Sequence, residues 1–176
     1  MSRNLVILAE KANAAEAYAE AIGVKNLHKN RDGFLEGEVS FSIGSREEPV
    51  HVEIVHSQGH CLRLLDPDEI DENYKKWDVA MLPIPFDDNK LKAIDDYKER
   101  KLNAIKKALG AADYIINAGD SGREGELIQR WILKEAGKGY VMGNALYRLK
   151  EALPENETVE TNADNGVAKK LVELFL

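Results

Sequence analysis

The residues best suited to do chemistry in this chain lie in one short acidic segment, residues 119–126. Its sequence is Gly-Asp-Ser-Gly-Arg-Glu-Gly-Glu, so three carboxylates and one guanidinium follow directly on an apolar run. Carboxylates at this density repel one another unless a cation joins them. Hard divalent cations such as Mg²⁺ bind oxygen ligands, commonly one or two carboxylates with water and phosphate. The segment therefore indicates a divalent-cation site.

A second acid, Glu10, stands in a similar setting near the N-terminus. It directly follows the apolar run 5–9 and precedes an alanine-rich segment. A lone glutamate in this position is commonly a helix cap or a solvated acid. Together with Asp120 it becomes a candidate third carboxylate of one cleft. The neighbouring Lys11 could contact a phosphate as a point charge, although a surface lysine is the ordinary interpretation.

Strands are the first of the elements that must position these acids. Short apolar runs at residues 4–9, 50–56 and 113–118 predict buried strands. Residues 34–43 predict two further short strands around Gly37. The acids Glu10 and Asp120 therefore follow the ends of two strands, where ligands bind in open α/β sheets.

Helices and connections complete this pattern. Helices are predicted at residues 11–22, 90–109 and 124–136, because a glycine stands at the end of each. Residues 42–48 predict a polar turn, and residues 59–88 predict an irregular stretch interrupted by prolines. Strand, acid and helix follow one another twice in the same order, which favours an α/β fold.

Composition limits the ways in which the chain could bind a partner. The 176 residues carry a net charge of −7, and their basic groups are separated by acids. A self-sufficient nucleic-acid binder usually has a basic face. Strong phosphate binding would therefore come from elsewhere, or from a metal that bridges carboxylates and phosphates. The single cysteine, Cys61, excludes an internal disulfide and fits a cytoplasmic protein. No apolar run approaches the length of a membrane span.

The order of these motifs resembles the Toprim domain of topoisomerases, primases and some nucleases. The segment 123–128 and the pair Glu10-Lys11 are most similar to type IA DNA topoisomerases, particularly to the topoisomerase III kind. Gly59-His60 and Leu82-Pro83-Ile84 resemble the segment that connects the two acidic motifs in those enzymes. The resemblance covers residues 4–135. It implies an α/β, Rossmann-like Toprim fold with a mostly parallel central sheet and helices on both faces.

The resemblance also implies a domain boundary. Residues 1–150 would form the Toprim domain, and residues 151–176 would be a tail or the start of the next segment. Within this region residues 147–153 predict a helix or an edge strand, 154–166 a polar loop, and 167–176 a short amphipathic helix.

By position, the resemblance implies a set of functional residues. Glu10 would handle a proton at the scissile phosphodiester, and Arg123 would neutralise phosphate charge. The cofactor would be Mg²⁺, for which Mn²⁺ can substitute, and the partner would be DNA, mainly single-stranded. The implied metal ligands are Glu10, Asp120 and Glu124, and the implied DNA-binding residues are Lys11 and His60.

Two departures from the family pattern bear on these roles. Gly122 stands where the family has a second aspartate, which removes one carboxylate from the site. The catalytic tyrosine of these enzymes belongs to a motif that surrounds none of the six tyrosines of this chain. The resemblance therefore implies that strand cleavage uses a tyrosine located outside this chain, and that DNA is held mainly by domains absent here.

Other interpretations remain open from the sequence. The chain could be a small stand-alone Toprim nuclease that directs water with the same acids. It could also be a non-catalytic Toprim scaffold or binding domain, which the missing aspartate favours. A primase fragment fits less well, because neither a zinc module nor a basic subdomain is visible. Finally, Asp120 could simply cap the helix that follows it.

Overall fold

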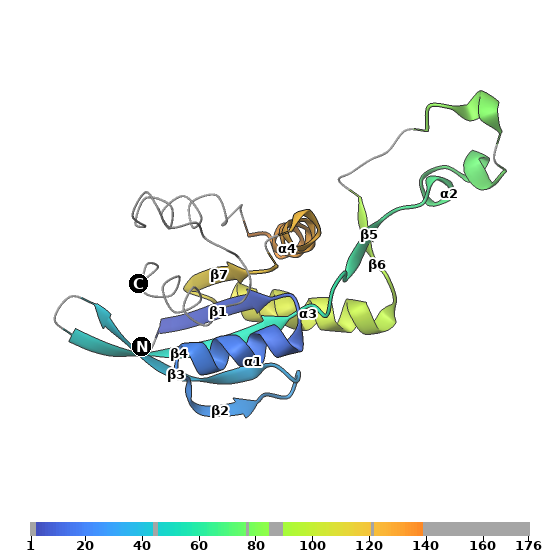
Figure 1. Ribbon diagram of the computed structural model, residues 1–176. Coiled ribbons are helices and arrows are strands. Elements are labelled where there is room, and N and C mark those ends of the chain that lie inside the picture. Colours follow the sequence, from blue (N-terminus) through green and yellow to red (C-terminus); the bar gives the residue numbers. More distant parts are fainter. Residues whose placement is uncertain (1–2, 44–45, 77, 85–89, 121, 139–176) are drawn as a thin grey trace, which may run out of the picture.

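The computed structural model describes residues 3–43, 46–76, 78–84, 90–120 and 122–138, and its centre is a five-stranded sheet of order β2-β3-β4-β1-β7 (Figure 1). β1 pairs in parallel with β4 and β7, whereas β3 is antiparallel to both β2 and β4. Four of the five strands therefore run in one direction, and the predicted α/β class with a mostly parallel sheet is confirmed. The strands are β1 Arg3–Ala9, β2 Lys25–Lys29, β3 Leu35–Ile43, β4 Arg46–His56 and β7 Tyr114–Ala118.

Helices cover both faces of this sheet, as predicted (Figure 1). Alternate residues of β1 point to opposite sides: Leu5 and Ile7 pack with α1, whereas Val6 and Leu8 pack with α3 and α4. All four side chains are at most 2% exposed. Burial of each stabilises the fold by about 1.5–3 kcal/mol, which fixes β1 as the centre of the core. The helices are α1 Ala12–Ala21, α3 Asp96–Gly110 and α4 Arg123–Glu135.

The region around Gly37 differs from its prediction. Residues 35–43 form one continuous strand rather than two short ones. A Cβ atom at Gly37 would lie 2.5 Å from the Lys25 carbonyl oxygen, so glycine allows β2 to approach closely and does not break β3. The turn predicted at residues 42–48 is shorter than expected, because β3 extends to Ile43 and β4 begins at Arg46, and these two residues pair.

Most of the stretch predicted to be irregular belongs to a projecting arm, described at residues 62–76, 78–84 and 90–93 (Figure 1). Its stem is a ribbon in which Leu64 pairs with Leu91, so residues 91–93 are a strand and not the start of the predicted helix. That helix begins only at Asp96, because the Asp95 side chain caps it by accepting a 2.7 Å hydrogen bond from the Lys98 amide. The elements of the arm are β5 Leu62–Leu64, α2 Pro67–Ile70, the 3₁₀ turns Glu72–Lys75 and Val79–Met81, and β6 Leu91–Ala93.

Charged contacts organise the base of the arm. Arg63 donates to both carboxylate oxygens of Glu69 at 2.6 and 3.0 Å, and Lys92 donates to the same carboxylate at 2.8 Å. These hydrogen bonds hold the pKa of Glu69 well below its usual value, and the one from Arg63 has the largest effect. Further out, Val79 and Leu82 are exposed to 83% and 58%.

The elements predicted at 147–153, 154–166 and 167–176 lie outside the described residues, as does the proposed boundary at residue 150. Among the helices that are described, none has the length and apolar character required to cross a membrane.

Candidate metal and phosphate site

The two predicted acids lie at the same edge of the sheet because their strands are neighbours. Ala9 of β1 pairs with Ala118 of β7, so Glu10 and Asp120 both follow the carboxyl ends of paired parallel strands. A single ammonium group joins them. The Nζ atom of Lys11 lies 3.2 Å from Glu10 Oε1 and 2.9 Å from Asp120 Oδ2. The hydrogen bonds to Asp120 and then to Glu10 raise the pKa of Lys11.

Glu10 and Asp120 differ in their access to solvent. The Glu10 side chain is 8% exposed, whereas that of Asp120 is 51% exposed. The Glu10 backbone is fixed by the turn 57–60, because its carbonyl oxygen accepts hydrogen bonds from Ser57 Oγ at 3.2 Å and from the Gly59 amide at 3.3 Å. The site thus contains one sheltered carboxylate on a rigid support and one carboxylate that solvent can reach.

The turn that carries Asp120 is packed tightly against α4. A Cβ atom at Gly125 would collide with the Asp120 backbone, and one at Gly119 would collide with the Gln129 side chain. The Gly119 amide also donates to Asn117 Oδ1 at 3.1 Å. Glycines in this segment are therefore required by close packing, which explains part of the pattern seen in the sequence.

The capping explanation for Asp120 is wrong. The N-cap residue of α4 is Gly122, which has no side chain to accept a hydrogen bond. The Asp120 carboxylate instead forms the hydrogen bond with Lys11. Glu124 and Glu126 do lie in the first turn of α4, where the helix dipole favours negative charge.

His60 and Glu124 form a second pair beside the first. The His60 Nε2 atom lies 3.3 Å from Glu124 Oε1, and its ring is 6.1 Å from that of Trp131. The structure thus brings His60 to the same turn that holds Glu10. Arg123 is exposed at the start of α4 and forms no ion pair with any described residue.

The donor chemistry of this edge fits a hard cation, since Glu10, Asp120 and Glu124 offer only oxygen ligands. Within the described ranges, however, no three acidic, histidine or cysteine side chains converge as a metal site. Lys11 supplies the positive charge between Glu10 and Asp120, and Glu124 pairs with His60 instead. The Lys11 ammonium thus bridges Glu10 and Asp120, and a metal would have to displace it to join these two acids.

Several residues that shape the site were not predicted. Tyr18 donates from its hydroxyl to the Ala118 carbonyl at 3.1 Å and so ties α1 to the end of β7. Burial first, and then the Asp120 charge, raises the pKa of Tyr18. Gln129 is fully buried, and neither of its amide atoms has a partner among the described residues. A polar residue within the apolar face of a helix is the sequence signal that could have identified Gln129.

Comparison with known proteins agrees with this architecture. The model of the Toprim domain matches residues 5–150, and the chain therefore belongs to the Toprim family. The chain is 34% identical over 130 residues to DNA topoisomerase 3 of Bacillus thuringiensis (strain Al Hakam), covering 73% of this chain and 16% of that protein. It is 32% identical over 133 residues to DNA topoisomerase 3 of Bacillus subtilis (strain 168), with coverage of 74% and 16%.

DNA topoisomerase 1 of Alkalihalophilus pseudofirmus is also similar, at 36% identity over 129 residues. That match covers 72% of this chain and 17% of the relative. The chain therefore spans about one sixth of the length of the relatives it matches. The resemblance to the Toprim region of DNA topoisomerases that the motifs indicated is confirmed.

Proposed function

We propose that this chain is the Mg²⁺-binding Toprim domain of a type IA DNA topoisomerase. It would support cleavage and religation of single-stranded DNA by a tyrosine located outside the chain. The proposal rests mainly on one observation. Glu10 and Asp120 both contact the Lys11 ammonium group at the ends of paired parallel strands. The similarity to DNA topoisomerases 3 supports DNA as the partner.

In this proposal Glu10, Asp120 and Glu124 hold Mg²⁺, or Mn²⁺ in its place. The ion, when bound, supplies positive charge to a phosphodiester as it reacts. Glu10 passes the proton of the attacking tyrosine hydroxyl to the departing 3′ oxygen during cleavage and returns it during religation. Its shelter from solvent suits this role, because few water molecules can compete for the proton.

The remaining residues act on phosphate charge and position. Lys11 moves from the carboxylates to a DNA phosphate once a metal replaces its charge, and Arg123 is free to contact a phosphate from the start of α4. His60 contacts DNA from the turn that also holds Glu10. These groups supply the electrostatic part of catalysis, and the tyrosine supplies the nucleophile.

The first test is a Mn²⁺ titration of the isolated chain followed by NMR line broadening. Broadening that begins together at Glu10, Asp120 and Glu124 supports one metal site. Asp120→Asn should weaken the broadening at all three, whereas Glu72→Gln, an exposed acid of the arm, should not. Broadening scattered over the acidic surface would instead favour the scaffold interpretation.

The second test distinguishes the enzyme classes. Residues 5–138 would replace the corresponding region of Bacillus subtilis DNA topoisomerase 3, and relaxation of negatively supercoiled DNA would be measured. The chimera should relax DNA, and its Glu10→Gln variant should be strongly impaired. Nicking of DNA by the isolated chain in the presence of metal would favour the nuclease interpretation, because no external tyrosine would then be needed.

A further inference from the structure

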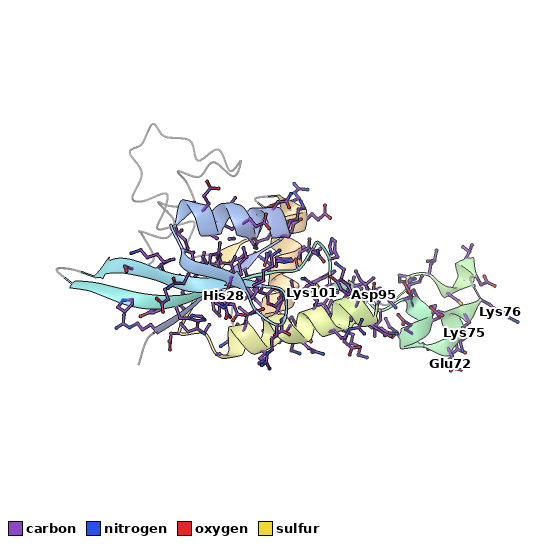
Figure 2. All side chains as sticks on the ribbon, turned by 90° about the horizontal axis from the view of Figure 1, so that it is seen from below. His28, Glu72, Lys75, Lys76, Asp95 and Lys101 are labelled. Carbon is purple, nitrogen blue, oxygen red and sulfur yellow. The ribbon has the colours of Figure 1, made fainter. Side chains whose placement is uncertain are left out.

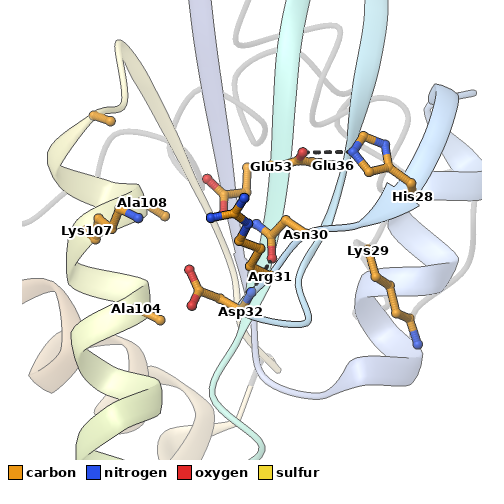
Figure 3. Close-up of a pocket in the computed structure, with 11 residues that line it drawn as sticks. His28, Lys29, Asn30, Arg31, Asp32, Glu36, Glu53, Ala104, Lys107 and Ala108 are labelled. Carbon is orange, nitrogen blue, oxygen red and sulfur yellow. Dashed lines mark hydrogen bonds and ion pairs between the residues drawn. The ribbon is translucent and has the colours of Figure 1, made fainter.

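A groove lined by several basic side chains lies between α3 and residues 28–32, which are the end of β2 and the turn that follows it. Its larger hollow has a volume of about 510 Å³ and lies against the helix face that carries Ala104 and Lys107 (Figure 3). A smaller hollow of about 170 Å³, lined by Tyr97 and Arg100, shares Asp32 and Ala104 with the larger one. The two hollows therefore form one groove along α3.

Four basic side chains of this groove lack a carboxylate partner among the described residues. Arg31, Arg100, Lys101 and Lys107 form no ion pair with any described residue, although the chain as a whole is acidic. Lys101 is partly buried, and its Nζ atom lies 4.9 Å from the centroid of the Phe34 ring. Elsewhere cations such as Lys11, Arg63 and Lys92 lie within 3.5 Å of carboxylates. Four unpaired positive charges in one groove indicate an anionic ligand.

Three carboxylates, those of Asp32, Glu36 and Glu53, also line the larger hollow and offset part of this positive charge. Glu36 is paired with His28 at 2.8 Å, and Glu53 accepts a 2.7 Å hydrogen bond from Asn30. Burial is the main cause that raises the pKa of Glu53. Asp32 alone lies at the junction of the two hollows. Its negative charge would repel an anionic ligand. Removing this charge by substitution should therefore improve binding of that ligand.

An exposed aromatic ring lies at the end of the groove that is nearest to the acidic site. Tyr97 is 52% exposed, and its hydroxyl donates to Gln58 Oε1 at 2.8 Å. Lys98 donates to the Gln58 carbonyl at 2.7 Å. Gln58 belongs to the turn 57–60, which fixes the Glu10 backbone and carries His60. The groove therefore leads directly to the candidate site.

We propose that this groove binds a single strand of nucleic acid, with its phosphates along Arg31, Arg100, Lys101 and Lys107 and one base stacked on Tyr97. A cationic groove combined with an exposed aromatic ring is the usual arrangement of single-strand binding sites. The inference rests on the proposed function for the identity of the strand as DNA. It adds a second DNA contact, which lies outside the acidic site and needs no metal.

The test measures binding of fluorescein-labelled (dT)₁₂ to the full chain by fluorescence anisotropy in EDTA. Single-strand binding through four phosphates predicts a slope of about −2.8 for the logarithm of the binding constant against that of salt concentration. The double variant Arg100→Gln, Lys107→Gln should reduce this slope to about −1.4. The matched control, Lys75→Gln with Lys76→Gln at the end of the arm, removes the same charge and should leave binding unchanged (Figure 2).

Substitutions at Tyr97 and Asp32 test the stacking surface and the charge of the groove separately. Tyr97→Leu should weaken binding about tenfold, whereas Tyr97→Phe keeps the ring and should bind like the wild type. Asp32→Asn should tighten binding. Equal competition by polyglutamate would overturn the inference, because the groove would then accept any polyanion.

The inference and the proposed function fail separately. If the groove variants bind (dT)₁₂ as tightly as the wild type does while Mn²⁺ still binds at the acidic site, the groove inference is wrong and the proposed function stands. If the groove variants lose binding but Mn²⁺ does not bind at Glu10 and Asp120, the groove remains a single-strand site in a chain with another function.

Discussion

Lys11 occupies the position between two carboxylates that a divalent cation would need. Its ammonium lies within 3.2 Å of both Glu10 and Asp120, so it offsets their mutual repulsion when no other cation is present. Lys11→Gln should therefore raise the affinity of the chain for Mn²⁺ several-fold at low salt, because the metal no longer competes with a resident charge. Isothermal titration calorimetry would measure this change.

The control for this prediction is Lys25→Gln, which removes an exposed lysine of β2 that forms no ion pair with the described residues. This variant changes the net charge equally and should leave the affinity for Mn²⁺ nearly unchanged. A fall in affinity on Lys11→Gln would show that the lysine orients the carboxylates rather than competing for them.

His56 gives the fold a dependence on pH that is separate from the site. It is 7% exposed, packs edge-on against Phe34, and burial first, then the charges of Lys101 and Lys29, lower its pKa to about 4. Its unfolded pKa is near 6.5, so the unfolded chain binds a proton in a pH range where the native chain does not. Between pH 6.5 and 4.5 the free energy of unfolding should fall by roughly 2 kcal/mol from this residue.

Urea unfolding at several pH values tests this prediction. His56→Gln removes the titrating ring, and its stability should change less with pH over the same range. The exposed His28, whose pKa is raised by its hydrogen bonds, shifts stability in the opposite direction. An unchanged pH profile in His56→Gln would contradict the assignment.

At the scale of single elements, the N-terminus of α4 has a vacant capping position. Gly122 is the N-cap residue with extended backbone, φ −88° and ψ 167°, and no described atom lies within 4 Å of a Cβ atom built there. Gly122→Asp would cap the helix and restore the family's second acid. We expect a gain of a few tenths of a kcal/mol in stability together with tighter Mg²⁺ binding.

Gly122→Ala separates these two effects. Alanine fits the same space and backbone but offers neither a cap nor a ligand, so it should improve neither property. Thermal unfolding with and without Mg²⁺ measures both. If Gly122→Asp stabilised the chain but left Mg²⁺ affinity unchanged, this position would not belong to the metal site.

Several of the helices and strands could be predicted from the sequence. β1, β4, β7, α1 and α4 were predicted because each combines an apolar run or stripe with a clear end, such as Gly23 or Gly137, both of which have positive φ. β2 was missed because its five residues are all exposed, and it is held by pairing with β3 rather than by burial. Its hydrophobic pattern therefore carries no signal.

The candidate site was predictable in its location but not in its contacts. The repeated strand–acid–helix units place Glu10 and Asp120 at one edge of the sheet, because side-by-side parallel strands end together. The bridging by Lys11, the pairing of His60 with Glu124, and the burial of Gln129 depend on side-chain packing between distant segments. Such contacts leave no periodic pattern in the sequence.

At the scale of the whole molecule, the arm and the sheet domain are nearly independent. None of the residues in α2 and the two 3₁₀ turns is buried, and Glu72, Lys75 and Lys76 lie far out on the arm (Figure 2). The ribbon that supports these elements ends where Leu64 pairs with Leu91. The arm beyond this pair therefore contributes little to the stability of the sheet domain.

A shortened chain tests this independence. Because β5 and β6 are antiparallel neighbours, an Asn-Gly turn can replace residues 65–90 and close the ribbon as a hairpin. We expect the shortened chain to fold with a melting temperature within a few degrees of the wild type and to bind Mn²⁺ and (dT)₁₂ equally well, since both proposed sites lie outside the arm.

In the chimera with the Bacillus subtilis relative, the same replacement should reduce DNA relaxation, because Val79 and Leu82 would no longer be available to contact the rest of the enzyme. Full relaxation by that chimera would show that the exposed apolar residues of the arm have no partner in the enzyme.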